Sequence, residues 1–406
     1  MLHVRVVILT LALLGVSGAL SGARGQSAAA ASPPLRALRV PAAMIRTSAA
    51  VPEVVDEARR LGFTALFVQV RDLGEAYYRS SLEPRATPLH LEPGYDPLAA
   101  MVTAAHDAGL QIHAWLPLTE AADSTSLPGA RGHVLYTHPE WLMVPRAIAA
   151  ELRRLDPRSP EYLGRLTRWI RATPGTPTRL YLSPGSADAS AHLAAVAREI
   201  VSRYELDGLH LDAVGLPGPD LDYGVASTEA FRRDSQRALT TADRVRLEEE
   251  HAVSPLAYPQ HAPEAWDSFR RARVTGLLMR IRSAVRGVRT SVRISAAVRG
   301  LPDVSFEDPR SWSELSVVDS VALPRRDAGG SDVPRADQAL PGSAAVWRLA
   351  RLDHMPADTL REWLQREPST DEGIVLDDAA ALVGEDAATL QRQQMIRDAF
   401  RGPGGR

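Results

Sequence analysis

The sequence predicts a single main domain with the (β/α)8 fold of a TIM barrel and long loops after several strands. Three observations support this. Strand-like apolar segments alternate with helical segments along most of the chain, and eight segments have strand character. The fourth of these, residues 206–214, places polar side chains between leucines at alternate positions. With 406 residues, 45% of them hydrophobic, the chain is long enough for such a core.

The chain can be organised around the strand at residues 206–214. Leu209 and Leu211 point to one side, and His210 and Asp212 to the other, because side chains alternate along a strand. In a parallel barrel the leucines would contact the outer helices, and the polar pair would face the barrel axis. Asp212 would then lie at the C-terminal mouth, where barrels of this kind keep their chemistry. The alternative is that Asp212 only caps the turn that follows.

The other expected strands share an apolar pattern of strand length and are bounded by Gly, Pro or polar residues. In chain order they are residues 38–45, in which Pro41 marks an irregularity, 64–70, 111–116, 292–298, 317–323, 344–352 and 373–376.

Helical spacing separates these strands. Helices are expected at residues 54–61, 98–108, 189–204, 228–250, 266–288, 357–365 and 385–400, with another near Trp312. Gly62 and Gly109 follow the first two and are typical C-terminal stops. Residues 72–97 and 215–223 are expected to be loops, residues 117–184 a long irregular insertion, and residues 329–342 a mobile polar segment.

The N-terminus has the pattern of a secretory signal, expected at residues 1–25. Arg5 is the basic residue, residues 6–16 form an apolar segment too short to span a membrane, and small residues precede Gln26. The alternative is an uncleaved membrane anchor. An Ala/Ser/Pro-rich linker at residues 26–35 and the barrel at residues 36–400 follow. We therefore expect a secreted or periplasmic protein with no stable membrane insertion after cleavage.

Composition excludes several classes of function. The formal net charge of -2 leaves no excess of positive charge for nucleic-acid phosphates. There is no Cys, so neither a disulfide nor lipid attachment to a cysteine is expected. The 11 His lack the spacing of metal ligands, and no nucleophile elbow or Gly-rich phosphate loop is present. We expect no metal and no cofactor.

Several motifs, in this order along the chain, resemble those of the family-10 glycosyl-hydrolase-like proteins, a secreted bacterial family in the α-amylase-like group. The motifs are Phe67-Val68-Gln69-Val70-Arg71, Tyr77-Tyr78-Arg79-Ser80-Ser81-Leu82-Glu83-Pro84, Tyr95-Asp96-Pro97-Leu98, His113-Ala114-Trp115, His138-Pro139-Glu140-Trp141-Leu142, Asp207-Gly208-Leu209-His210-Leu211-Asp212, and Trp266 with Phe269-Arg270-Arg271. The resemblance implies a TIM-type barrel that acts on glycans; some relatives are assigned to peptidoglycan strands stripped of their peptides.

The chain also departs from the family pattern. Relatives continue from the central aspartate with Tyr-aliphatic-Arg-Tyr-Pro, where this chain has Ala213, Val214, Gly215, Leu216 and Pro217. Pro117 stands where relatives tend to have Asn. These differences raise the question of whether the family's chemistry is kept.

Glycoside hydrolysis needs two carboxyl groups, one to protonate the leaving oxygen and one to attack or to activate water. Asp212 is the expected nucleophile or charge-stabilising carboxylate. Glu75 is the favoured acid, because relatives carry an acidic residue after the position of Gly74. Other carboxyl groups that could serve are Asp72, Glu120 and Asp377. Glu75 could equally be a solvated loop residue.

Six further residues are expected to bind substrate, and four of them have a structural alternative. Arg71 could clamp a substrate group or pair with Asp212; His113 and His210 could instead be packed core histidines; Trp141 could pack a lid or stack on a sugar. The six are Gln69, Arg71, His113, Trp115, His210 and Trp141.

Together these features predict an exported glycoside hydrolase that acts on a cell-envelope or environmental polysaccharide by two-carboxylate acid/base hydrolysis. Peptide-free peptidoglycan strands are one such substrate. The alternative is a catalytically degraded barrel that binds glycan without cleaving it.

Overall fold

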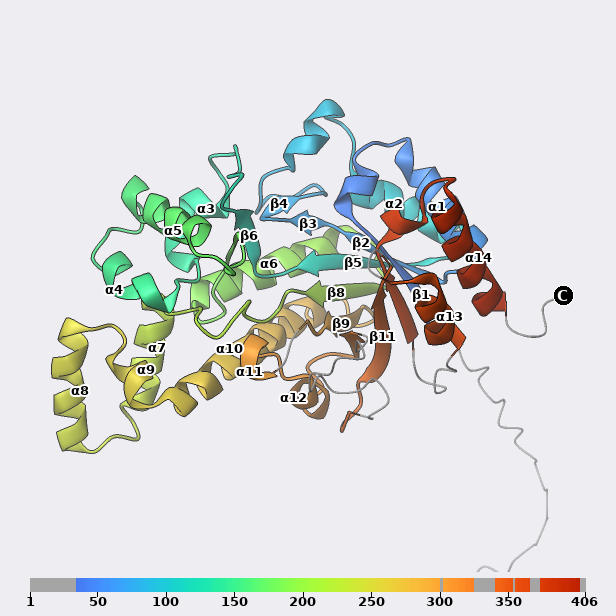
Figure 1. Cartoon of the computed structure of the whole chain (residues 1–406). Coiled ribbons are helices and arrows are strands. Elements are labelled where there is room, and N and C mark those ends of the chain that lie inside the picture. The colour runs from blue at the N-terminus through green and yellow to red at the C-terminus, as the bar shows by residue number, and fades with distance from the viewer. Residues whose placement is uncertain (1–33, 300–301, 325–339, 353–354, 366–372, 402–406) are drawn as a thin grey trace, which may run out of the picture. The chain divides into compact units, whose positions relative to one another are not determined.

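The predicted strands pair in parallel and close into a barrel, which confirms the expected (β/α)8 fold class. The computed structural model describes residues 34–299, 302–324, 340–352, 355–365 and 373–401. The eight barrel strands follow one another around the barrel in the order β1, β2, β5, β8, β9, β10, β11 and β12, and β12 pairs with β1 (Figure 1). Their bounds are Arg36–Val40, Ala65–Gln69, Gln111–Pro117, Gly208–Asp212, Arg293–Ala297, Ser320–Pro324, Ala345–Arg351 and Gly373–Asp377.

Alternation along each strand separates two cores. Leu209 and Leu211 of β8 are fully buried in the larger core outside the barrel. The interior core is smaller and holds the opposite faces of the strands, among them Phe67, Trp115 and Trp347. His210 and Asp212 are likewise fully buried. The predicted division of β8 into an outward leucine face and an inward polar face is therefore confirmed.

The helices that cover the barrel start and stop where their sequences provide caps. The Asp96 side chain accepts a hydrogen bond from Ala99 N at the start of α2, and Ser186 caps α6 in the same way. Gly62 ends α1 in the left-handed conformation with φ 88°, which a residue without Cβ adopts at little cost. The outer helices are α1 Ala50–Leu61, α2 Pro97–Asp107, α6 Ala187–Arg203, α10 Pro263–Arg286, α12 Pro309–Glu314, α13 Ala357–Gln365 and α14 Ala387–Arg401.

The predicted bounds of two elements are wrong. The first strand ends at Val40, and Ala42–Ile45 forms a 3-10 helix, η1, because Pro41 has no N–H to continue the strand. The helix expected at residues 228–250 is two helices, α7 Val225–Ser235 and α8 Thr241–Val253. Thr240 caps the second one by accepting a hydrogen bond from Asp243 N. A short helix, α9 Ala257–His261, then leads into α10.

The long insertion after β5 is an ordered lobe. A short antiparallel pair, β6 Glu120–Asp123 and β7 Arg179–Tyr181, forms its base. The helices are α3 Val134–Thr137, α4 Ala149–Leu152 and α5 Pro160–Ala172, with the 3-10 turns η3 Pro139–Trp141 and η4 Arg146–Ile148. Figure 1 shows the arrowheads of β5 and β8 directed towards this lobe. The lobe therefore stands at the C-terminal mouth of the barrel.

The remaining described elements are short. The loop after β2 contains an antiparallel pair, β3 Arg71–Asp72 and β4 Glu75–Ala76, followed by η2 Thr87–Leu91. After β9 comes α11 Pro302–Ser305, and after β12 comes η5 Ala379–Leu382.

Three expectations fall outside the described residues, namely the signal at residues 1–25, most of the linker at 26–35 and most of the polar segment at 329–342. Within the described residues, no helix is both long enough and apolar enough to cross a membrane.

Candidate functional site at the barrel mouth

Asp212 ends β8 at the mouth and is completely buried, and its carboxylate accepts hydrogen bonds from several donors. Its Oδ1 accepts hydrogen bonds from Ala213 N at 2.7 Å and from Arg299 Nε at 2.6 Å. Its Oδ2 accepts from Arg39, from Trp115 Nε1 at 3.1 Å and from a second nitrogen of Arg299 at 2.9 Å. These donors hold the carboxylate in one orientation.

Arg39 links Asp212 to a second carboxyl group. It lies on β1, whose register places it beside Asp377 of β12. One guanidinium nitrogen pairs with Asp212, and the other pairs with Asp377 Oδ2 at 3.1 Å. The guanidinium also lies over the ring of Trp115, 3.6 Å from its centroid. Strands from opposite ends of the chain thus bring two aspartates onto a single guanidinium.

Arg299, just after β9, links Asp212 to a third carboxyl group. Its Nη1 donates to Glu120 Oε1 at 2.8 Å, while its other two nitrogens bind Asp212. The second oxygen of Glu120 pairs with Arg179. Asp212 therefore shares one guanidinium with Glu120 and another with Asp377.

Environment drives the pKa values of these carboxyl groups apart. Burial alone would raise the pKa of Asp212, but the charges of Arg39 and Arg299 outweigh it and hold the pKa well below its usual range. Burial raises the pKa of Asp377, and the nearby Asp212 charge adds to the effect against the opposing charge of Arg39. Burial also raises the pKa of Asp72. One carboxylate whose pKa is lowered beside a carboxyl group whose pKa is raised is the arrangement expected of a catalytic pair.

Glu75 does not share these contacts. It lies on β4, and its carboxylate accepts hydrogen bonds from Thr87 N at 3.2 Å and Thr87 Oγ1 at 3.1 Å. Its role as the acid stays a prediction. Of the three other carboxyl groups offered by the sequence, Glu120 and Asp377 are the ones that arginines connect to Asp212.

Arg71 and Gln69 bind the protein itself. Arg71 is fully buried and pairs with Glu83 at 2.9 Å, so its ion pair forms with Glu83 and not with Asp212. Its Nη1 donates to the carbonyl oxygens of Pro117, Leu118 and Glu120. Gln69 accepts from Ala42 N and donates to the carbonyl of Arg71. Both residues therefore tie mouth loops together.

The two histidines lie inside the barrel below the mouth. His113 stacks on Phe67 with ring centroids 4.6 Å apart, and burial lowers its pKa to about 3. The His113 ring occupies the space beside Gly208, where a Cβ would overlap it. His210 is fully buried and shares a hydrogen bond of 2.9 Å with Ser295 Oγ. In this structure both histidines pack in the core.

The tryptophans differ in exposure and contacts. Trp115 is only 8% exposed, and its N–H and ring are used by Asp212 and Arg39. Trp141, in η3 of the lobe, stacks on His138 with centroids 3.8 Å apart, and it is partly buried. Trp115 thus positions Asp212, and Trp141 packs within the lobe.

The residues that depart from the family pattern are part of the packing around Asp212. Ala213 has a φ of 48°, its N–H donates to Asp212, and its carbonyl accepts from Thr119. A Cβ on Gly215 would overlap the Ser305 carbonyl, and Leu216 N donates to that carbonyl at 2.8 Å. Pro117 is the register partner of Asp212. None of these replacements removes a carboxyl group from the site.

The sequence reasoning missed Arg39 and Arg299. Arg39 occupies an inward-facing alternate position of the first strand, and Arg299 directly follows the strand predicted at residues 292–298. A charged residue at an inward position near the end of a barrel strand was the available signal.

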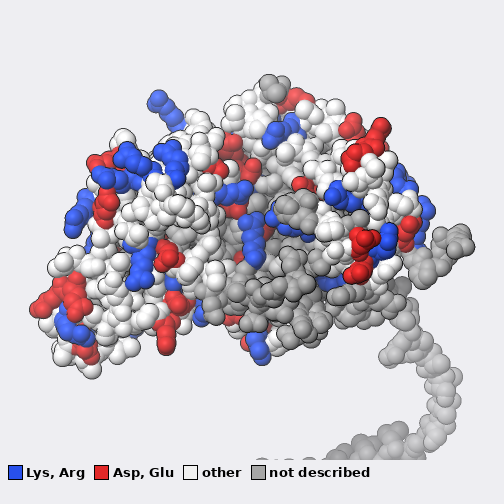
Figure 2. Space-filling model, in the orientation of Figure 1, with Lys and Arg blue, Asp and Glu red and all other residues white. Residues whose placement is uncertain are grey.

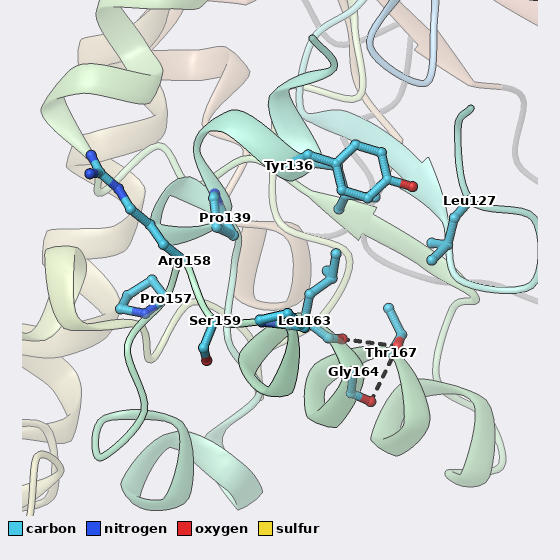
Figure 3. A pocket seen from close by; sticks show the side chains of 11 residues that line it. Leu127, Tyr136, Pro139, Pro157, Arg158, Ser159, Leu163, Gly164 and Thr167 are labelled. Atoms are coloured by element: carbon cyan, nitrogen blue, oxygen red, sulfur yellow. Dashed lines mark hydrogen bonds between the residues drawn. The ribbon is translucent and has the colours of Figure 1, made fainter. Parts of the chain in front are cut away.

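A separate pocket of about 350 Å³ lies in the insertion lobe (Figure 3). Leu127, Tyr136 and Pro139 line it, together with residues of α5. The hydroxyls of Ser159 and Thr167 at its wall already donate to backbone carbonyls within the lobe. Among the described residues, no group of three or more His, Cys, Asp and Glu is placed to hold a metal ion. The chemistry that the structure offers is therefore at the mouth.

Comparison with known proteins adds to this geometry. The model of the family described as Glycosyl hydrolase-like 10 matches residues 43–325. Glycosyl hydrolase YngK of Bacillus subtilis (strain 168) is 23% identical over 266 residues, which cover 63% of this chain and 41% of that protein. Glycosyl hydrolase DigH of Escherichia coli (strain K12) is 25% identical over 282 residues, which cover 67% of this chain and 56% of that protein. The chain thus spans about half the length of these relatives.

The fold is also similar to a solved structure. The glycoside hydrolase domain of PgaB (BpsB) from Bordetella bronchiseptica matches with a TM-score of 0.57 and 15% sequence identity, covering 91% of this chain and 99% of that one. This likeness supports the barrel fold.

Proposed function

Because this chain belongs to the Glycosyl hydrolase-like 10 family, we propose that it hydrolyses O-glycosidic bonds in a polysaccharide, with Asp212 as the charged carboxylate and Asp377 as the acid. The observation that carries the proposal is that Arg39 binds both aspartates while their pKa values move in opposite directions. The substrate class, a cell-envelope or environmental glycan such as peptide-free peptidoglycan strands, is part of the same proposal.

In this mechanism Asp377 donates its proton to the leaving oxygen as the glycosidic bond breaks. Asp212, which stays ionised, attacks the anomeric carbon or stabilises the positive charge that develops there. Water then supplies the hydroxyl of the new reducing end and returns a proton to Asp377. Asp377 suits the acid role better than Glu120, because its side chain is 18% exposed and its pKa is raised, whereas Glu120 is held by two arginines.

One observation favours the alternative, a barrel that binds glycan without cleaving it. Asp212 has no exposed surface, and Arg299 lies against both of its oxygens. Incubating the protein with defined glycans, counting new reducing ends and measuring binding on the same samples separates the two. New reducing ends support the hydrolase, whereas binding without them supports the alternative.

We expect Asp377→Asn to lower hydrolysis of a natural glycan by about 10²–10⁴-fold, the usual contribution of general acid catalysis. Cleavage of an aryl glycoside with a good leaving group should fall much less, since that group leaves without a proton. Activity of the unchanged protein should decline as pH rises through the raised pKa of Asp377, and the variant should lack that decline. No decline from Asp212 is expected near pH 4, because its pKa is depressed.

Glu75→Gln and Glu120→Gln serve as matched variants in these assays. If Glu75→Gln alone shows the leaving-group dependence, Glu75 is the acid and the assignment to Asp377 is wrong. A loss with every substrate in Glu120→Gln would instead reflect the release of Arg179 and Arg299.

We also propose that the protein is exported, on the basis of Arg5, the apolar residues 6–16 and the small residues before Gln26. N-terminal sequencing of the protein recovered from outside the cytoplasm of a bacterial host should begin near Gln26. Recovery only from inside the cell with Met1 intact would contradict this.

A further inference from the structure

The groups that face solvent over the site are cationic, although its deepest groups are carboxylates. The side chains of Asp212 and Glu120 are 0% and 4% exposed, whereas those of Arg299 and Arg179 are 47% and 43% exposed. Figure 2 shows side chains of both signs meeting near the middle of this face, where the surface is hollowed. A ligand that approaches Asp212 therefore meets the two guanidinium groups first.

These guanidinium groups keep donors to spare. An arginine has five N–H donors. Among the residues that the structure describes, Arg179 donates through one nitrogen, Nη1, to Glu120. Arg299 uses Nε and Nη2 on Asp212 and Nη1 on Glu120. The edge of Arg179 formed by Nε and Nη2 is thus left to bind a carboxylate with two parallel hydrogen bonds.

Glu120 sets the position of this edge. Its two oxygens hold one nitrogen of Arg179 and one of Arg299, so the two guanidinium groups lie side by side despite their like charge. Arg179 belongs to β7, and Glu120 to β6, its antiparallel partner. The lobe therefore presents Arg179 beside the mouth on a paired strand, which fixes the guanidinium more closely than a loop would.

Three guanidinium groups, those of Arg39, Arg179 and Arg299, meet the carboxylates of Asp212 and Glu120. The charges of Asp72 and Asp123 also act on Arg179. The attraction for an anionic ligand therefore comes from the exposed guanidinium groups of Arg179 and Arg299 and not from an excess of positive charge. The face of Trp115, which could have stacked on a neutral sugar, is covered by Arg39.

We propose that Arg179, with Arg299 beside it, binds a carboxylate of the substrate, so that the site selects acidic glycans. This inference rests on the proposed function for the identity of the ligand as a glycan. Arg179 binds the substrate carboxylate directly, and Arg299 keeps its contacts with Asp212 and Glu120.

The test compares each acidic glycan with a form whose carboxyl group is neutralised. The probes are oligogalacturonate with its methyl ester, and peptide-free peptidoglycan strands with their carboxyl-reduced form. Cleavage and equilibrium binding are measured for the full chain, Arg179→Gln, Arg179→Lys and the control Arg310→Gln, which alters an exposed arginine on α12. We expect the unchanged protein to prefer an acidic form roughly tenfold or more, the effect of a charge-assisted hydrogen-bonding pair.

Arg179→Gln should remove this preference, because it should raise the KM for the acidic form more than the KM for the neutral form. Arg179→Lys should keep part of it, because it retains the charge without the planar fork. Equal loss with acidic and neutral forms would mean that Arg179 only holds Glu120, and would overturn the proposal. Equal cleavage of both forms by the unchanged protein would also overturn it.

Failure of the hydrolase proposal is distinguishable from failure of this one. Preferred binding of the acidic form, lost in Arg179→Gln and weakened by salt, would support the carboxylate site even if no reducing ends appeared. Cleavage without any acid preference would support the hydrolase and overturn the carboxylate site.

Discussion

Asp212→Asn is expected to abolish glycan hydrolysis, with a loss of roughly 10³-fold or more, because the group that attacks or stabilises the anomeric centre loses its charge. The substitution keeps the shape of the side chain. The amide of Asn cannot attack the anomeric carbon, and it cannot compensate the positive charges of Arg39 and Arg299. Counting reducing ends released from the glycans that the unchanged protein cleaves measures the effect.

The matched control is Asp207→Asn, at the opposite end of the same strand region. Asp207 accepts a hydrogen bond from Ile112 N at 2.8 Å, and its side chain is 40% exposed. This variant should keep its activity. Thermal unfolding and binding of the glycan would establish that Asp212→Asn is folded.

Two results would contradict the role of Asp212. Hydrolysis by folded Asp212→Asn at a rate near that of the unchanged protein would place the essential carboxylate elsewhere. Equal losses in Asp207→Asn and Asp212→Asn would point to a defect of the whole strand instead of the site.

Arg39→Met should have the largest effect on stability, a loss of about 3–5 kcal/mol in the free energy of unfolding, because removing one partner of a buried ion pair leaves a charge without compensation. The side chains of Arg39 and Asp212 are 4% and 0% exposed, so water cannot replace the lost partner. Arg299 and Trp115 still contact Asp212, which places the expected value towards the lower end. Urea unfolding measures it.

A double variant isolates the charge from the packing. Arg39→Met combined with Asp212→Asn should recover part of the loss, since the buried charge is gone. Arg310→Met is the exposed control, and we expect a change within about 0.5 kcal/mol because exposed pairs contribute little. Loss of the same size in Arg39→Met and Arg310→Met would show that the buried pair does not stabilise the fold.

Two arginines compensate the charge of the buried Asp212 carboxylate, which would destabilise the fold without them. Arg39 of β1 and Arg299, which follows β9, both donate hydrogen bonds to Asp212. The depressed pKa of Asp212 means that its contribution to stability is present above the ordinary Asp pKa near 4 and is lost as pH falls towards its depressed value. This contribution should therefore be complete in mildly acidic solution and should decline once the pH falls below about 4.

The sequence by itself determined the barrel and the place of Asp212. Both depend on local patterns: alternation along 206–214 separates Leu211 from Asp212, and strand–helix alternation specifies the fold class. The family motifs agree, and the family match at residues 43–325 confirms that resemblance.

The tertiary structure alone decided which residues surround Asp212. His113 and Trp115 share the inward face of β5. Trp115 lies nearer the mouth than His113, in register with His210, and of the two only Trp115 reaches Asp212. Arg39 and Asp377 meet because barrel closure pairs β1 with β12. Alternation is a property of neighbouring residues, whereas register, closure and the path of the lobe bring residues from distant parts of the chain together. For that reason the sequence located Asp212, and only the folded barrel showed its arginines and the carboxyl groups that share them.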